Sequence, residues 1–266
     1  MKTALRLFII IISVLGLTII SQIGGLIFLL SVVISKKWKP KFRFKNSIIF
    51  LVLYLFTTFV IIPFLAPLFG REKIKHTAVI QPTNYMTVIL NRNYVRPEMN
   101  QLLNNAAAQL KNTRIQLHYL DANFPFMNKF PLLPHKSHND GKKLDISLIY
   151  EDQQNTISLK QKSISGYGVF EAPQKNEHNQ IQKCLQKRYF QYDFPKYVTF
   201  GSIHKNLTFS AKGTKKLIKA LLKQQKLGKL FIEPHLKQRL GLTDHRVRYH
   251  GCGAVRHDDH IHIQLR

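Results

Sequence analysis

Two long runs without a charged residue dominate the start of the chain. Leu7 to Ser35 is 29 residues long, Ser47 to Gly70 is 24, and both are dense in Ile, Leu and Val. A helix needs about 20 apolar residues to cross the hydrocarbon core of a bilayer. Residues 1–70 are therefore expected to form a two-helix transmembrane hairpin that anchors the protein, with spans at about 7–35 and 47–70. Pro63 and Pro67 should bend the last turns of the second span.

The charges around these runs indicate an orientation. A cleaved signal peptide would have an apolar core of only about 7–15 residues, which does not fit the first run. Six basic residues stand between the runs, namely Lys36, Lys37, Lys39, Lys41, Arg43 and Lys45. The positive-inside rule places that loop in the cytoplasm. Both termini are then expected outside, in a multi-pass protein of the cytoplasmic (inner) membrane whose main domain lies on the periplasmic or extracellular side.

The whole chain is strongly basic, with a formal net charge of +26. A positive charge of this size attracts nucleic acid, anionic lipid or anionic wall polymers. It can also simply increase solubility, with no specific partner involved. The sequence has no compact Arg-rich arm and no aromatic RNA-binding signature, so no nucleic-acid partner is expected. Charge alone does not choose between lipid and wall polymers, and the membrane is expected as a partner because of the two apolar runs.

Beyond the spans, residues 71–96 are expected to form a connector and residues 97–266 the main folded domain. Apolar residues at helical spacing predict helices over 97–111 and 214–225. Alternation predicts strands over 114–120, 144–150, 230–233 and 260–265. Helices and strands mix without regular alternation, which is typical of an α+β fold, here a small antiparallel sheet with flanking helices. Residues 151–196 are polar and should form an irregular insertion that lines a cleft.

Two short segments carry the residue types of a metal site. The first runs from Pro134 to Asp145 and contains His138, the turn residue Gly141 and Asp145; the second runs from Val255 to Leu265 and contains His257, His260 and His262. A catalytic zinc ion takes three imidazole or carboxylate ligands and keeps one position for water. His260 and His262 are two residues apart in a predicted strand and so share a face. One of them can bind a metal while the other addresses the bound water.

These segments resemble motifs of a known family. His138 through Asp145, with Gly141 three residues after the histidine, is similar to the first metal-binding motif of the D-alanyl-D-alanine metallopeptidases, which are related to lysostaphin-type enzymes. The run from His257 to His262 resembles more narrowly the terminal motif of the penicillin-insensitive murein endopeptidases (MepA). The resemblance covers residues 97–266 loosely and excludes the membrane hairpin.

The resemblance implies an activity and a role for each residue. One Zn²⁺ ion would be held by His138, Asp145 and His262, with His260 as the general base and His257 orienting water or stabilising the oxyanion. The substrate would be peptidoglycan or a muropeptide, cut at a D-amino-acid-containing bond by an endopeptidase or a D,D-carboxypeptidase. A direct role for His135 is left open, as are the bond that is cut and the use of another divalent ion.

Basic residues, cysteines and the overall function each allow further interpretations. Lys142, Lys143 and Arg256 are candidates for binding the carboxylates of a wall peptide. Cys184 and Cys252 either form one disulfide or are two separately buried thiols. The functional alternative to a peptidase is a non-catalytic, zinc-stabilised module that binds the cell envelope. The oligomeric state is not predicted.

Overall fold

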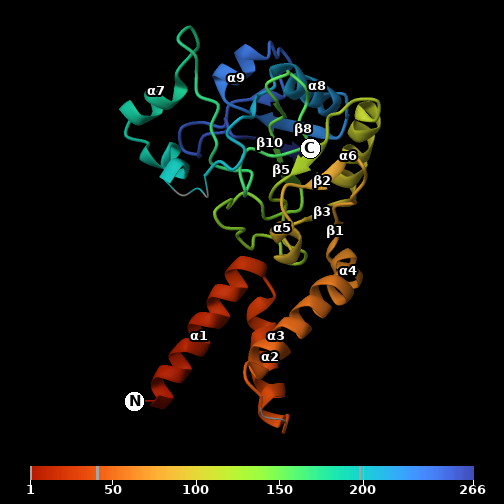
Figure 1. Cartoon of the computed structure of the whole chain (residues 1–266), viewed down its shortest axis with the longest axis vertical. Coiled ribbons are helices and arrows are strands. Elements are labelled where there is room, and N and C mark those ends of the chain that lie inside the picture. The colour runs from red at the N-terminus through yellow and green to blue at the C-terminus, as the bar shows by residue number, and fades with distance from the viewer. Residues whose placement is uncertain (1, 40–41, 198, 200) are drawn as a thin grey trace.

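The computed structural model describes residues 2–39, 42–197, 199 and 201–266. A helical region holds the N-terminal part of the chain, and a mixed domain of strands and helices holds the rest (Figure 1). The helical region consists of α1 (Lys2–Ser21), α2 (Gly24–Lys37), α3 (Lys45–Phe56), the π-helix η1 (Thr57–Ile61), α4 (Ile62–Leu65) and the 3-10 helix η2 (Ala66–Phe69). Two helices, spanning 3–21 and 45–69, are long and apolar enough to cross a membrane.

The first apolar run is not one helix, so the expected span over 7–35 is wrong. The chain turns at Gln22, whose φ is +66°, and the Ser21 hydroxyl accepts a hydrogen bond from the Gly24 N–H at 3.0 Å. Glycine is needed beside the turn because a Cβ on Gly25 would lie 2.5 Å from the Val14 carbonyl oxygen. The start of α2 therefore doubles back closely against the end of α1.

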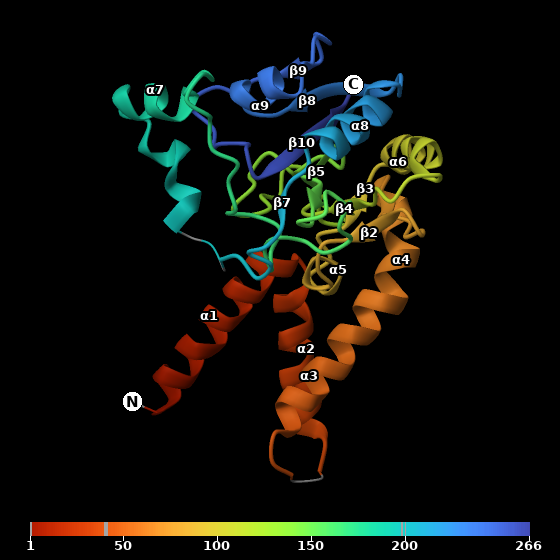
Figure 2. The ribbon, with the colours of Figure 1, turned by 45° about the horizontal axis from the view of Figure 1, so that its top comes forward.

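The turn changes the path of the anchor. Helix α2 has 14 residues, a length of about 21 Å at 1.5 Å per residue, and it contacts both α1 and α3. The N-terminal end of α1 lies at the same end of the helical region as the C-terminal end of α2 and the start of α3 (Figures 1 and 2). A single helix over 7–35 would have placed these two points at opposite ends.

The second run forms a continuous helical path that leaves α-geometry near its two prolines. The π-helix η1 ends two residues before Pro63, and Pro67 lies in the 3-10 helix η2. A proline lacks an N–H to donate, so a helix accommodates it by local changes of this kind. The path ends at Gly70, whose φ of +69° suits a residue without a side chain.

The domain is built on a six-stranded sheet with the order β2-β4-β5-β10-β8-β9. These strands are β2 (Ile80–Pro82), β4 (Leu117–Tyr119), β5 (Lys143–Ser147), β10 (His260–Leu265), β8 (Leu227–Phe231) and β9 (Val247–Arg248). The middle four are antiparallel, whereas β2 pairs with β4 and β9 pairs with β8 in parallel. The sheet is therefore larger than the small antiparallel sheet that was expected, and it is mixed rather than purely antiparallel. The difference lies in the two edge strands, which pair in parallel and were missed. Two-residue strands also form the pairs β1 (Glu72–Lys73) with β3 (Tyr94–Val95) and β6 (Tyr150–Glu151) with β7 (Thr208–Phe209).

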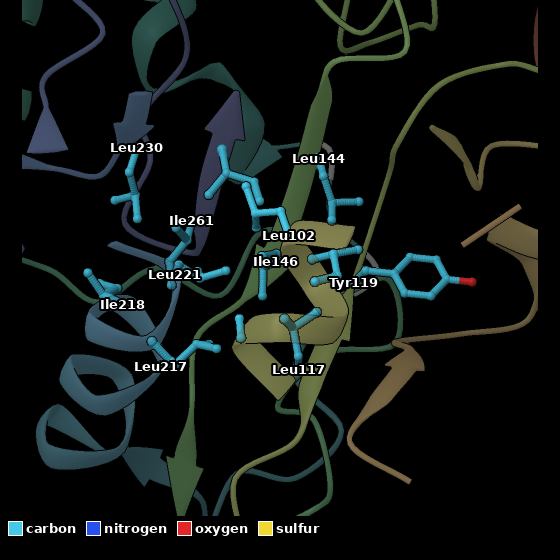
Figure 3. Close-up of a cluster of buried hydrophobic side chains, with 14 of the residues drawn as sticks. Leu102, Leu117, Tyr119, Leu144, Ile146, Leu217, Ile218, Leu221, Leu230 and Ile261 are labelled. Carbon is cyan, nitrogen blue, oxygen red and sulfur yellow. The ribbon is translucent and has the colours of Figure 1, made fainter. Parts of the chain in front are cut away.

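Helices α6 (Pro97–Leu110) and α8 (Ala211–Leu222) cover one face of the sheet (Figure 3). Their buried leucines pack against alternate strand residues, including Leu144 and Ile146 of β5 and Ile261 and Ile263 of β10. Because strand side chains alternate between faces, the residues between these positions face away from the helices. This alternation sends Asp145, Ser147, His260 and His262 to the opposite face, where they are buried by loops. The remaining helices are α5 (Met86–Ile89), α7 (Gln180–Gln186) and α9 (Pro234–Arg239).

The insertion at 151–196 is largely irregular, as expected. Besides Glu151 at the end of β6, its regular elements are α7 and the 3-10 helices η3 (Phe190–Tyr192) and η4 (Phe194–Tyr197), the last of which ends just beyond it. Cys184 in α7 and Cys252 before β10 form a disulfide, so the alternative of two separate thiols is wrong. The disulfide ties the insertion to the segment that leads into the second histidine motif.

The core under the sheet should set the stability of the domain. Leu217 of α8 is fully buried, and Leu217→Ala should lower the free energy of unfolding by about 2–5 kcal/mol through lost burial and a cavity. Lys216→Ala on the exposed side of the same helix is the matched control and should change it by less than about 0.5 kcal/mol. Denaturant unfolding of the two variants measures both values, and equal values would contradict the assigned face.

Candidate metal centre

Strand pairing creates the first contact of the site. In the antiparallel ladder between β5 and β10, His262 lies directly opposite Asp145. Side chains that face each other across such a ladder lie on the same face of the sheet and within reach of each other. His262 Nδ1 is accordingly 2.8 Å from Asp145 Oδ1, and both residues are almost fully buried.

His138 reaches the pair from the loop that connects β4 to β5. Its Nδ1 donates to the carbonyl oxygen of Ala122 at 2.6 Å, which leaves the lone pair of Nε2 free. Nε2 lies 3.2 Å from His262 Nδ1 and 3.3 Å from Asp145 Oδ1. A backbone carbonyl that fixes the tautomer of a histidine in this way is a usual neighbour of a metal ligand.

The three ligand atoms fit a single small cation. They all lie within 4.8 Å of one another, at separations of 2.8, 3.2 and 3.3 Å. A tetrahedral ion with bonds of about 2.0–2.1 Å places its donors about 3.3 Å apart. His138, Asp145 and His262, the residues predicted as ligands, could therefore hold a metal ion, with a fourth position left for another group.

The protonation states suit this role. Burial raises the pKa of Asp145, but His138 and His260 outweigh it and hold this pKa well below its usual range. Burial lowers the pKa of His262 to about 4, even though Asp145 opposes the shift. The carboxylate is thus charged and the His262 imidazole neutral near pH 7, and these are the forms that bind metals.

His260 stands beside the ligand group without belonging to it. Its Nδ1 is 2.5 Å from Asp259 Oδ1, and its Nε2 is 3.8 Å from Asp145 Oδ1. With one ring proton on Nδ1 directed to Asp259, Nε2 faces the three ligands. Burial lowers the pKa of His260, but Asp259 and Asp145 outweigh it and raise the pKa to about 9, so the ring is doubly protonated near pH 7 without a metal. A cation bound at Asp145 would lower this pKa and favour the neutral ring, whose Nε2 can accept a proton.

His257 forms another wall of the site. Its ring stacks on His250 at a centroid distance of 5.2 Å, and its backbone N–H donates to the buried carboxylate of Glu233 at 2.9 Å. Burial and then the nearby His260 and His262 hold the pKa of His257 well below its usual range. The Nδ1 atom of His257 is buried without a hydrogen-bond partner among the described residues. A neutral ring in this position can offer one N–H to a bound group.

Three more residues surround Asp145. The hydroxyl of Tyr167 donates to Asp145 Oδ2 at 2.8 Å and accepts from the Asp121 N–H at 3.2 Å. His135 Nδ1 lies 3.1 Å from Asp121 Oδ2 and 3.5 Å from Asp145 Oδ2. Asp121 also forms a two-bond ion pair with Arg92, with both distances at 2.7 Å. His135 is thus placed at the site, beside the ligands rather than among them.

The site opens into a cleft of about 220 Å³. His135, His138, Asp145, His257, His260 and His262 line it, together with Gln191 of the insertion and His250. An adjoining cavity of about 350 Å³ is lined by Tyr167, Phe194 and Pro195, and it shares His135 and His260 with the first. The insertion therefore lines both the cleft and the adjoining cavity, as predicted.

The three basic residues proposed to bind substrate carboxylates lie elsewhere or are already engaged. Lys142 reaches the backbone oxygen of Arg266, and Lys143 pairs with Asp140. Arg256 is held by Asp258 at 2.6 Å and Asp193 at 2.5 Å. The assignment is wrong for Lys142 and Lys143, which line neither the metal cleft nor the adjoining cavity. Arg256 does line the adjoining cavity, with its guanidinium paired to the two carboxylates. The one Lys or Arg among the described residues that line the metal cleft is Lys136.

Some residues of the site had little signal in the sequence. Tyr167, Asp121 and Glu233 meet the histidines only through folding, since they lie far from both motifs along the chain. Asp259 stood inside the second motif, but only the geometry assigns it to His260. Tyr167 between two glycines was a possible hint, because such a turn can bring one side chain into a cleft.

The chain matches no known family model and no curated protein. The assignment of the site therefore depends on its geometry and on the chemistry of its ligands.

Metal binding should follow the ligand set. His138→Ala and His262→Ala should each weaken zinc binding by more than the 10–100-fold that is typical of changes around the ligands, while His260→Ala should retain the ion. Titration of the full-length protein against a chelator of known affinity measures this. His245→Ala, at a histidine with 84% side-chain exposure, is the control. Loss of the ion from His260→Ala would mean that the roles of base and ligand are exchanged.

Tyr167 should act on the metal through Asp145. Tyr167→Phe removes the hydroxyl that donates to Asp145 Oδ2 and should lower metal affinity by about 10-fold or more. The same chelator competition reads the effect, with Tyr197→Phe at an exposed tyrosine as the control. Unchanged affinity in Tyr167→Phe would exclude a role in holding the carboxylate.

Proposed function

We propose that this protein is a membrane-anchored zinc peptidase that hydrolyses D-amino-acid-containing peptide bonds of peptidoglycan. One observation carries the proposal: two imidazoles and a carboxylate converge on one point, while the imidazole of His260, oriented by Asp259, faces the same point. Structural zinc sites are usually closed by four protein ligands, whereas catalytic sites use three and remain open. Three ligands beside a cleft fit the catalytic kind.

The chain's own residues can perform the proton transfers. A zinc ion in this site would polarise a scissile carbonyl and lower the pKa of water. His260 Nε2 can take the proton of the attacking water, and Asp259 stabilises the resulting imidazolium through Nδ1. The protonated ring can then give its proton to the amine that leaves. His257, which stays neutral, can donate an N–H to the oxygen on which negative charge develops.

The substrate class is inferred from the resemblance of both motifs to murein peptidases, supported by two features of the structure. The cleft and its neighbouring cavity meet at His135 and His260, so a peptide can extend to both sides of the reacting bond. Lys136 in the cleft can pair with a carboxylate, a group that wall peptides carry. The choice between an endopeptidase and a D,D-carboxypeptidase depends on whether the leaving-group side of the cleft accepts more than one residue.

The location is inferred from the anchor. The N-terminal end of α1, the C-terminal end of α2 and the start of α3 lie at the end remote from the domain (Figure 2). Residues 1–70 carry eight basic side chains and no acidic one, and in the sequence these stand at the start of the chain and between the two apolar runs. The positive-inside rule then places that end in the cytoplasm and the domain on the periplasmic or extracellular side of the cytoplasmic membrane. Because the chain turns at Gln22, this orientation puts the start of α1 in the cytoplasm and replaces the expectation that both termini lie outside.

Digestion of purified muropeptides by the full-length protein in detergent tests the proposal. Mass spectrometry should show cleavage that a chelator stops and added zinc restores. His260→Ala should keep its metal and lose on the order of 10²–10⁴-fold in kcat, the usual contribution of a general base. His245→Ala should behave as the wild type does.

Two results would contradict the proposal. Zinc-loaded protein that binds muropeptides without cutting them would favour the non-catalytic envelope-binding module. Full activity in His260→Ala would remove the assigned base.

A further inference from the structure

We propose that Arg71, the first residue after the membrane anchor, is a positioning residue that fixes the metal ligand His138. The inference depends on the proposed function, because it assigns a role to the anchor in building that same site. It makes the anchor part of the metal centre and not only a tether.

Arg71 is a fully buried arginine whose guanidinium binds one loop at both ends. The loop, here called the ligand loop, comprises residues 122–141 and carries His135 and His138. One Nη atom donates to the carbonyl oxygen of Phe124, and the other donates to Asn128 Oδ1 at 2.7 Å and to the Asn139 carbonyl at 3.3 Å. The side chain is 1% exposed, so water does not compete for these bonds.

The bonded carbonyls stand next to the groups that place His138. Phe124 follows two residues after Ala122, whose carbonyl fixes the His138 tautomer, and Asn139 directly follows His138. The loop also closes at Gly141, whose φ is +80° and where a Cβ would lie 3.2 Å from Arg71 Nε. Arg71 thus holds together the entry and exit of the loop at the points nearest to the ligand.

The backbone of Arg71 is hydrogen-bonded to the anchor. Its backbone N–H donates to the Ala66 carbonyl at 3.1 Å, so it caps the last helical turn of the second apolar run. A second contact joins the α1–α2 turn to the same loop, because the Phe126 N–H donates to Gln22 Oε1 at 3.0 Å. Phe126 also lies against Phe69 with ring centroids 5.0 Å apart. Figure 1 shows the α1–α2 turn at the end of the helical region that faces the domain.

A lysine cannot replace this arginine. The planar guanidinium directs its two Nη atoms to acceptors on separate segments at once, whereas an ammonium is a single point on a flexible stem. Burial lowers the pKa of Arg71 to about 10, so the group stays charged near pH 7, and Asp140 helps to keep it so. A charged donor that is buried against carbonyls forms stronger bonds than a neutral one.

The test compares Arg71→Lys with Arg246→Lys in the full-length protein. Arg246 is the matched control because it also donates to backbone carbonyls, those of Leu222 and Gln224, but lies away from the ligand loop. Zinc affinity is measured by chelator competition, and hydrogen exchange is followed for the amides of residues 124–139. Arg71→Lys should weaken zinc binding by about 10–100-fold and speed exchange in that loop, while Arg246→Lys should do neither. Gln22→Leu, which breaks the second contact, should cause a smaller effect of the same kind.

Each outcome decides the inference. Wild-type zinc affinity in Arg71→Lys would overturn it, whatever the exchange shows. Equal losses in Arg71→Lys and Arg246→Lys would also overturn it, because they would indicate general destabilisation. If the wild type binds zinc but cuts no muropeptide, the proposed function fails and the affinities still decide the role of Arg71. If the wild type binds no zinc, the proposed function fails as well, and unchanged loop exchange in Arg71→Lys would overturn the positioning role.

Discussion

The pairing of β5 with β10 is the constraint on which the site depends. Its register sets His262 opposite Asp145, and the alternation of strand side chains sends both to the face not covered by α6 and α8. A slip of one residue would turn the metal-binding side chains into the core and the isoleucines of β10 out of it. The hydrophobic core and the candidate metal centre are therefore specified by the same alternating pattern, read from opposite faces of two strands.

Burying two imidazoles and a carboxylate costs free energy, and hydrogen bonds from neighbouring groups offset this cost. Two of the ligands and the base each have an oriented partner: Ala122 for His138, Tyr167 for Asp145 and Asp259 for His260. Buried polar groups without partners cost free energy, so these contacts stabilise the fold as well as fix the ring orientations. Arg71 extends the arrangement outward, because it bonds the backbone on both sides of His138.

The sequence predicted the centre of this structure better than its edges. Periodic apolar residues predicted α6, α8, β5 and β10, and the motif spacing predicted which histidines share a face. The helix break at Gln22 was missed because apolar composition alone does not distinguish one long helix from two helices joined at a tight turn. The edge strands β2 and β9 have three and two residues and therefore show no period. The partners of Arg256 and Lys143 were missed because ion pairs depend on contacts that form only in the folded chain.

X-ray absorption spectroscopy at the zinc edge on the full-length protein tests the central claim most directly. The account predicts a first shell of nitrogen and oxygen atoms at about 2.0–2.1 Å, with two imidazoles resolved by their outer-shell scattering. It also predicts that His262→Ala removes one of these imidazoles or the whole ion. A shell containing sulfur, or a shell unchanged by His262→Ala, would contradict the claim that His138, Asp145 and His262 form the metal centre.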